Sequence, residues 1–69
     1  MRGRTSTEAI RLYLAALAAD PGIAEAHKKL ALCYEEKGEP RRAVAEYRRY
    51  LSTDPPDADR VRAALEELQ

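Results

Sequence analysis

Residues 24–57 read AEAHKKLALCYEEKGEPRRAVAEYRRYLSTDPPD and carry most of the information about the fold. Both halves are rich in Ala, Leu, Glu and Arg, which favour helix over strand. Between them lies Gly38-Glu39-Pro40, where glycine can end one helix and proline suits the first turn of the next. The segment closes on Asp54-Pro55, and the residue before a proline avoids helical geometry. We therefore expect two helices, over about 23–37 and 40–52.

The same punctuation continues on both sides of this segment. Asp20-Pro21 marks another boundary, so we expect a helix over about 6–19. Thr5 followed by Glu8 is typical of a capping box at its start. An acidic start also suits a fourth helix over about 57–68. The chain is therefore predicted to be all-α, with about four helices.

Each expected helix carries a stripe of residues, mostly apolar or small, that recurs every three or four positions. Such a stripe is typical of a helix that packs on its neighbours. The expected buried residues are Ala9, Ile10, Tyr13, Ala16 and Leu17; Ala26, Leu30, Cys33, Tyr34 and Lys37; Ala43, Val44, Tyr47, Tyr50 and Leu51; and Ala58, Val61, Leu65 and Leu68.

Identical residues recur 34 positions apart, on these stripes and at the Asp-Pro breaks. The pairs are Ala9 and Ala43, Tyr13 and Tyr47, Leu17 and Leu51, Asp20 and Asp54, Pro21 and Pro55, and Ala24 and Ala58. Tetratricopeptide arrays have this period, and residues 24–57 resemble one complete repeat of that family. The matching positions are Leu30, Ala31, Tyr34, Gly38, Ala43, Tyr47 and Pro55. Two positions depart: His27 stands where tryptophan is common, and Tyr50 places a large ring where alanine is usual.

The resemblance implies antiparallel helical hairpins in a short right-handed superhelical array. It divides residues 1–69, a single domain, into three parts. Residues 5–19 look like the second helix of a preceding repeat, 24–57 like a complete repeat, and 58–69 like a capping helix or the first helix of a next repeat.

Composition and charge exclude several classes of protein. With one cysteine (Cys33) and one histidine (His27), the sequence offers neither an internal disulfide nor the usual zinc ligands. The formal net charge is zero, so no overall field attracts nucleic acid or an anionic membrane. The longest apolar run, 12–19, is far shorter than the roughly 20 residues of a spanning helix. We expect a cytoplasmic setting.

The sequence also lacks the residue patterns of catalysis. No paired carboxylates mark a cleft, no glycine-rich loop precedes a helix, and no nucleophile has a base beside it. His27 is expected to fill the packing edge of its helix, and Cys33 to fill the core. We therefore predict a non-catalytic protein without cofactor or metal.

Four arginines in the third helix are the best case for nucleic acid: Arg41, Arg42, Arg48 and Arg49. Glu46 interrupts this face, and nearby acidic residues offset its charge. A solvated outer face is the more economical interpretation, so no nucleic-acid partner is expected.

The resemblance implies that a protein or peptide partner binds the concave surface, which is lined by the first helix of each hairpin. The residues expected there are Glu25, Lys28, Lys29, Leu32, Glu36, Arg62 and Glu66. Relatives that clamp a carboxylate typically also use asparagine, which this chain does not contain. A general peptide groove is therefore favoured over that clamp.

The alternative function is self-association. Leu12 and Leu14 lie off the buried stripe of the first helix, and burying a leucine is worth roughly 2 kcal/mol. Either the chain is part of a longer array, or the first helix pairs with a second copy. A designed repeat protein is a further possibility.

Overall fold

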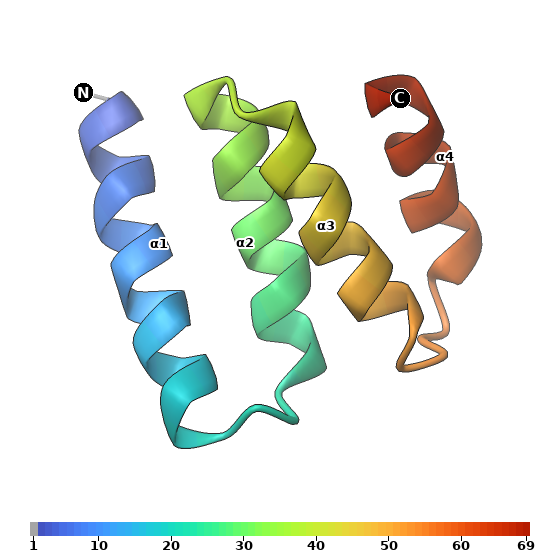
Figure 1. Ribbon diagram of the computed structural model, residues 1–69, viewed down its shortest axis with the longest axis horizontal. Helices are drawn as coiled ribbons and strands as arrows, with labels where there is room; N and C mark the ends of the chain where they lie inside the picture. Colours follow the sequence, from blue (N-terminus) through green and yellow to red (C-terminus); the bar gives the residue numbers. More distant parts are fainter. Residues whose placement is uncertain (1) are drawn as a thin grey trace.

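The computed structural model describes residues 2–69, with side chains from residue 7 onward. It contains four α-helices: α1 (Arg2–Ala19), α2 (Ala24–Lys37), α3 (Pro40–Leu51) and α4 (Ala58–Leu68). Neighbouring helices run antiparallel (Figure 1). There is no strand within residues 2–69, so the all-α prediction is confirmed.

The start of α1 differs from the prediction. The helix begins at Arg2 rather than near Ser6, so Thr5 lies inside it. An N-cap residue has non-helical backbone, and the predicted capping box is therefore wrong. No proline interrupts residues 2–5, and the chain can continue its helical geometry through them. The side chain of Thr5 lies outside the described part of the structure.

The turn between α2 and α3 forms where glycine and proline predicted it. Gly38 has φ of 82°, in the left-handed region that glycine reaches without a steric penalty. Its N–H donates to the carbonyl of Glu35 at 3.1 Å, and the N–H of Glu39 donates to that of Tyr34 at 2.8 Å. These bonds satisfy carbonyls at the end of α2, and Pro40 then begins α3.

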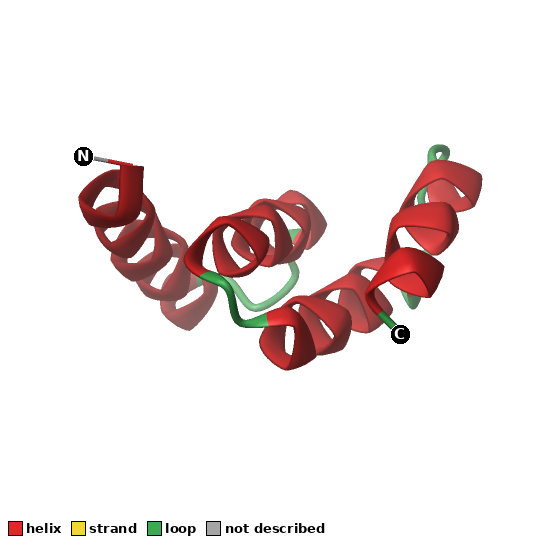
Figure 2. Ribbon diagram, turned by 90° about the horizontal axis from the view of Figure 1, so that it is seen from above, coloured by secondary structure: helices red, strands yellow, loops and turns green. Residues whose placement is uncertain are grey.

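The helices pack in chain order. Among the described residues, the helix pairs in contact are α1 with α2, α2 with α3, and α3 with α4. Seen from above, α3 lies to one side while α2 and α4 lie to the other (Figure 2). Each inner helix therefore has two neighbours and each outer helix has one.

The core lies along α2 and α3, as the stripes predicted. Leu30, Ala31 and Ala43 are fully buried. The other buried members of this cluster are Ile10, Tyr34, Tyr47, Tyr50 and Val61. Lys37 was also predicted to be buried, and this is wrong. It is exposed at the end of α2, where its ammonium lies 3.3 Å from a carboxylate oxygen of Glu39.

A polar contact joins the two inner helices at the edge of this core. The hydroxyl of Tyr47, on α3, donates to the carboxylate of Glu35, on α2. Burial and this bond raise the pKa of Tyr47 above its ordinary value. The phenol therefore stays protonated at neutral pH and contributes a satisfied hydrogen bond between the helices.

Candidate functional site

Four of the predicted binding residues form one exposed stripe along α2. Glu25, Lys29, Leu32 and Glu36 follow one another at intervals of four, three and four residues, and all are exposed. A helix turns about 100° per residue, so these side chains share the side of α2 that lies away from buried Leu30. Leu32 is 44% exposed among charged neighbours. We call these four residues the outward stripe.

Lys28 lies beside this stripe, but its charge is already paired within the chain. Its Nζ lies 2.5 Å from Oδ2 of Asp57, just before α4, and 5.6 Å from the centre of the Tyr50 ring. The hydroxyl of Tyr50 donates to the other Asp57 oxygen at 2.6 Å. Lys28 therefore fastens α2 to the turn between α3 and α4.

The pKa values of Lys28, Tyr50 and Asp57 shift in the directions that their hydrogen bonds require. The bond between Lys28 and Asp57 raises the pKa of the lysine and lowers that of the carboxyl group. The bond from Tyr50 lowers the pKa of Asp57 further, and the same bond raises the pKa of the phenol. The contacts with Lys28 and Asp57 also accommodate the large ring of Tyr50, which is only 8% exposed.

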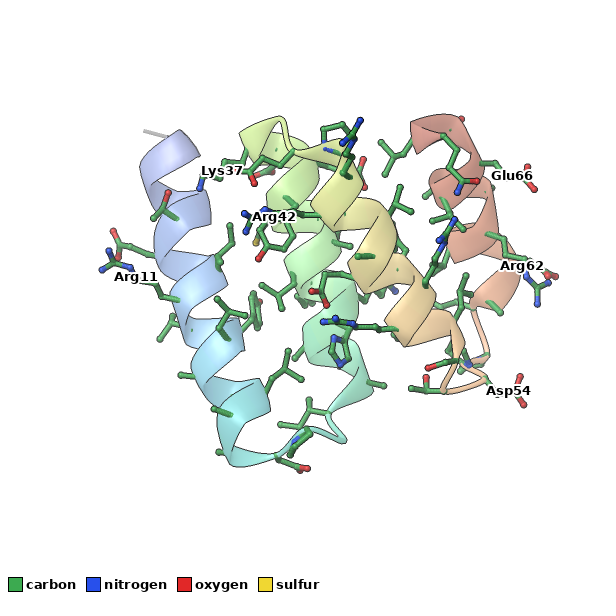
Figure 3. The ribbon with its side chains drawn as sticks, in the orientation of Figure 1. Arg11, Lys37, Arg42, Asp54, Arg62 and Glu66 are labelled. Atoms are coloured by element: carbon green, nitrogen blue, oxygen red, sulfur yellow. The ribbon has the colours of Figure 1, made fainter. Side chains whose placement is uncertain are left out.

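Arg62 and Glu66 are not brought together with the outward stripe. Both extend from the side of α4 that faces away from the other helices (Figure 3). Val61 is buried, and the next residue along a helix points about 100° away. Arg62 instead lies 3.5 Å from Asp59 on its own helix. We therefore leave both residues out of the candidate site.

Two hollows flank the outward stripe. The first lies between α1 and α2 and is mainly apolar; its lining residues are Tyr13, Ala16, Ile23, Glu25, Ala26 and Lys29. The second lies between the start of α2 and the turn before α4; its lining residues are Ala24, Glu25, Tyr50, Thr53, Asp54, Pro55, Pro56 and Asp57. The stripe and the first hollow together form a surface that can receive an apolar segment with charges at its edges.

The two leucines proposed for self-association lie on different sides of α1. Leu12 is 71% exposed and Leu14 is 47% exposed. Two residues along a helix correspond to a rotation of about 200°, so one flat partner surface cannot cover both. Leu12 stacks one turn from Ala16, which lines the first hollow. Leu14 points toward the opposite side of the molecule.

A buried polar pair between α2 and α3 was not expected from the sequence. Nδ1 of His27 donates to Oε1 of Glu46 at 2.7 Å, and the two side chains are 15% and 10% exposed. Glu46 was assigned to the outer arginine face, which is wrong. It lies three residues after fully buried Ala43, and this spacing was the available signal. His27 occupies the packing edge that was predicted for it.

The arginine-rich outside of α3 is partly neutralised by its own neighbours. Arg42 lies 3.0 Å from Glu39 and 5.9 Å from the centre of the Tyr34 ring. Arg49 lies 3.4 Å from Glu46. These contacts support the interpretation of a solvated face.

Cys33 packs against the core, and burial raises the pKa of its thiol. The thiol is therefore protonated and poorly nucleophilic at neutral pH. Within the described side chains, no group of three or more His, Cys, Asp and Glu residues is arranged to hold a metal ion. No described helix combines the length and apolar character needed to cross a bilayer.

A family model described as tetratricopeptide repeat matches residues 1–58, which span α1, α2 and α3. No curated protein and no solved structure matches the chain.

Proposed function

The chain belongs to the tetratricopeptide repeat family, and on this basis we propose that it binds a segment of another protein along the outward stripe of α2. Tetratricopeptide repeats generally mediate protein–protein interaction, and the family is typically non-catalytic. The surface proposed for this role consists of Glu25, Lys29, Leu32 and Glu36. Lys28 is not part of it, because its ion pair with Asp57 supports the fold.

One observation carries this proposal: an exposed leucine lies among alternating charges, beside an apolar hollow. Leu32 can contribute apolar burial, while Glu25, Lys29 and Glu36 can orient a partner by charge. The hollow between α1 and α2 provides space beside the stripe for a second apolar anchor of the partner.

Selection from a random peptide library on the immobilised chain tests this proposal. For the peptides recovered, Leu32→Glu should weaken binding by about tenfold or more, because an apolar anchor becomes a charge. Arg48→Glu, on the exposed outside of α3, is the matched control and should leave binding unchanged. Peptides whose affinity depends on Arg48 and not on Leu32 would contradict the proposal. Helical circular dichroism confirms that both variants fold.

Self-association is a second candidate function, and the exposure of Leu12 and Leu14 favours it. Because they lie on different sides of α1, a two-fold interface would bury one of them. Sedimentation of Leu12→Glu and Leu14→Glu identifies which, since the charged residue should convert a dimer to a monomer. A chain that is already monomeric at high micromolar concentration would eliminate this function.

A further inference from the structure

The surface shared by α1 and α2 carries both an apolar hollow and apolar groups that could fill one. Tyr13, Ala16 and Ile23 line the hollow. Leu12, on the same side of α1 as Ala16, is the most exposed large apolar residue among the described side chains, and Leu32 is 44% exposed on α2. A surface with both projections and a recess can be complementary to itself.

The charges beside the hollow have the same property. Glu25 and Lys29 are opposite in sign, lie one helical turn apart, and both line the hollow. Consider a two-fold axis that passes just outside α2, perpendicular to the helix and level with the turn between Glu25 and Lys29. Rotation about this axis places the α2 of a second copy antiparallel over the first. Glu25 then faces Lys29 of the second copy, and Lys29 faces its Glu25. One operation thus forms two equivalent ion pairs.

The same operation brings the apolar groups together. Ala16 lines the hollow with Glu25 and Lys29, so it lies level with the axis, where a small side chain permits close approach. Because α1 and α2 run antiparallel (Figure 1), the positions of Leu12 and Leu32 along their helices put both toward the same end of the unit, on the far side of the axis from Ile23. Rotation places both leucines over the second copy's hollow near Ile23, which is 37% exposed.

We propose that a second copy of this chain occupies the hollow, with the two α1–α2 units stacked antiparallel about an axis between Glu25 and Lys29. The inference rests on the proposed self-association and specifies its surface and register. Leu12 is buried in this arrangement, while Leu14 stays in solvent on the opposite side. Glu36 lies beyond the end of the opposing α2. The dimer covers Glu25, Lys29 and Leu32 of the outward stripe, so a peptide partner and a second copy compete for these residues.

A charge exchange tests this register, with the dissociation constant of the dimer measured by sedimentation equilibrium. Glu25→Lys and Lys29→Glu should each weaken the dimer roughly tenfold, because every substitution places like charges together twice. The double variant, Glu25→Lys with Lys29→Glu, should return the constant to within about threefold of the original. Glu36 belongs to the same stripe but lies outside the overlap, so Glu36→Lys should not change the dissociation constant. Circular dichroism verifies equal helix content in all four variants.

The outcomes separate the two levels of the proposal. A monomer at every concentration overturns both the self-association and the register. A dimer that ignores the single substitutions, or that the double variant does not restore, keeps self-association and overturns the register. A dimer that responds to Leu14→Glu and not to Leu12→Glu likewise places the interface on the other side of α1.

Discussion

Leu30 shows how much of the stability depends on single side chains. It is fully buried between helices, in a chain of only 69 residues. We expect Leu30→Ala to lower the free energy of unfolding by about 2–5 kcal/mol, since it leaves a cavity in the core. Urea denaturation measures this. Leu12→Ala, at a 71% exposed position, is the control and should change stability by less than about 0.5 kcal/mol in dilute solution. Equal effects would contradict the core described above.

Asp57 gives the fold a dependence on acid. Hydrogen bonds from Lys28 and Tyr50 lower its pKa in the folded chain, so the unfolded chain binds protons more readily. The stabilisation is complete above the unfolded pKa, near 4, and is lost as the pH falls through the folded value. The stability difference between the original chain and Asp57→Asn should therefore be constant between about pH 6 and pH 5 and shrink as the pH falls below about 4.

Urea midpoints at several pH values measure this difference. Asp59→Asn is the matched control, because its side chain is 99% exposed. A difference between the original chain and Asp57→Asn that stays constant across the acid range would show that Asp57 is not held by these two donors.

The buried residues that the sequence could predict are those that recur at helical spacing. Ala43, Tyr47 and Val61 lie on apolar stripes, and period alone assigns them to the core. Glu46 has the same helical spacing, three residues after Ala43, but residue type argues against it, because a carboxylate is ordinarily placed outside and its partner His27 lies 19 residues away. That pairing depends on how α2 packs on α3, which local sequence does not specify.

The end of α2 depends on the backbone conformation of Gly38. Gly38 ends α2 through its positive φ, and an added Cβ there would meet no atom within 4 Å. Gly38→Ala should therefore cost about 1 kcal/mol from backbone strain alone. Thermal or urea unfolding measures it. Gly22→Ala, whose backbone has no positive φ, should cost less; the reverse order would contradict this account of the turn.

The positions of α2, α3 and α4 along the chain were predictable, since glycine and proline mark their limits. The rotation of α4 was not. Arg62 and Glu66 were expected on the concave surface, but α4 contacts only α3 among the described helices, and buried Val61 sets its rotation. Helical spacing defines which residues share a face; the neighbour that covers that face determines where the others point.

The whole molecule is a linear stack, and its stability should vary along it. The inner helices α2 and α3 each have two neighbours, while α1 and α4 have one. In such a stack the end elements open first. Native-state hydrogen exchange should therefore show slower amide exchange in α2 and α3 than in α1 and α4. Equal protection of all four helices would indicate a single cooperative unit instead.

The stack also determines which surface is available for a partner. Core packing uses one side of α2 and leaves Glu25, Lys29, Leu32 and Glu36 on the other, next to the hollow against α1. The outside of α3 carries its own exposed residues, including Arg48. The function proposed for the chain depends on the first of these surfaces.

Amide chemical shifts can locate the bound surface residue by residue. A ¹⁵N-labelled chain is titrated with the tightest peptide recovered from the library, at a concentration where the chain alone is monomeric. We predict that the largest shift changes fall on the outward stripe of α2 and on Tyr13 and Ala16 across the hollow. Changes centred on the arginine face of α3, with α2 unaffected, would contradict the interaction surface assigned to this protein.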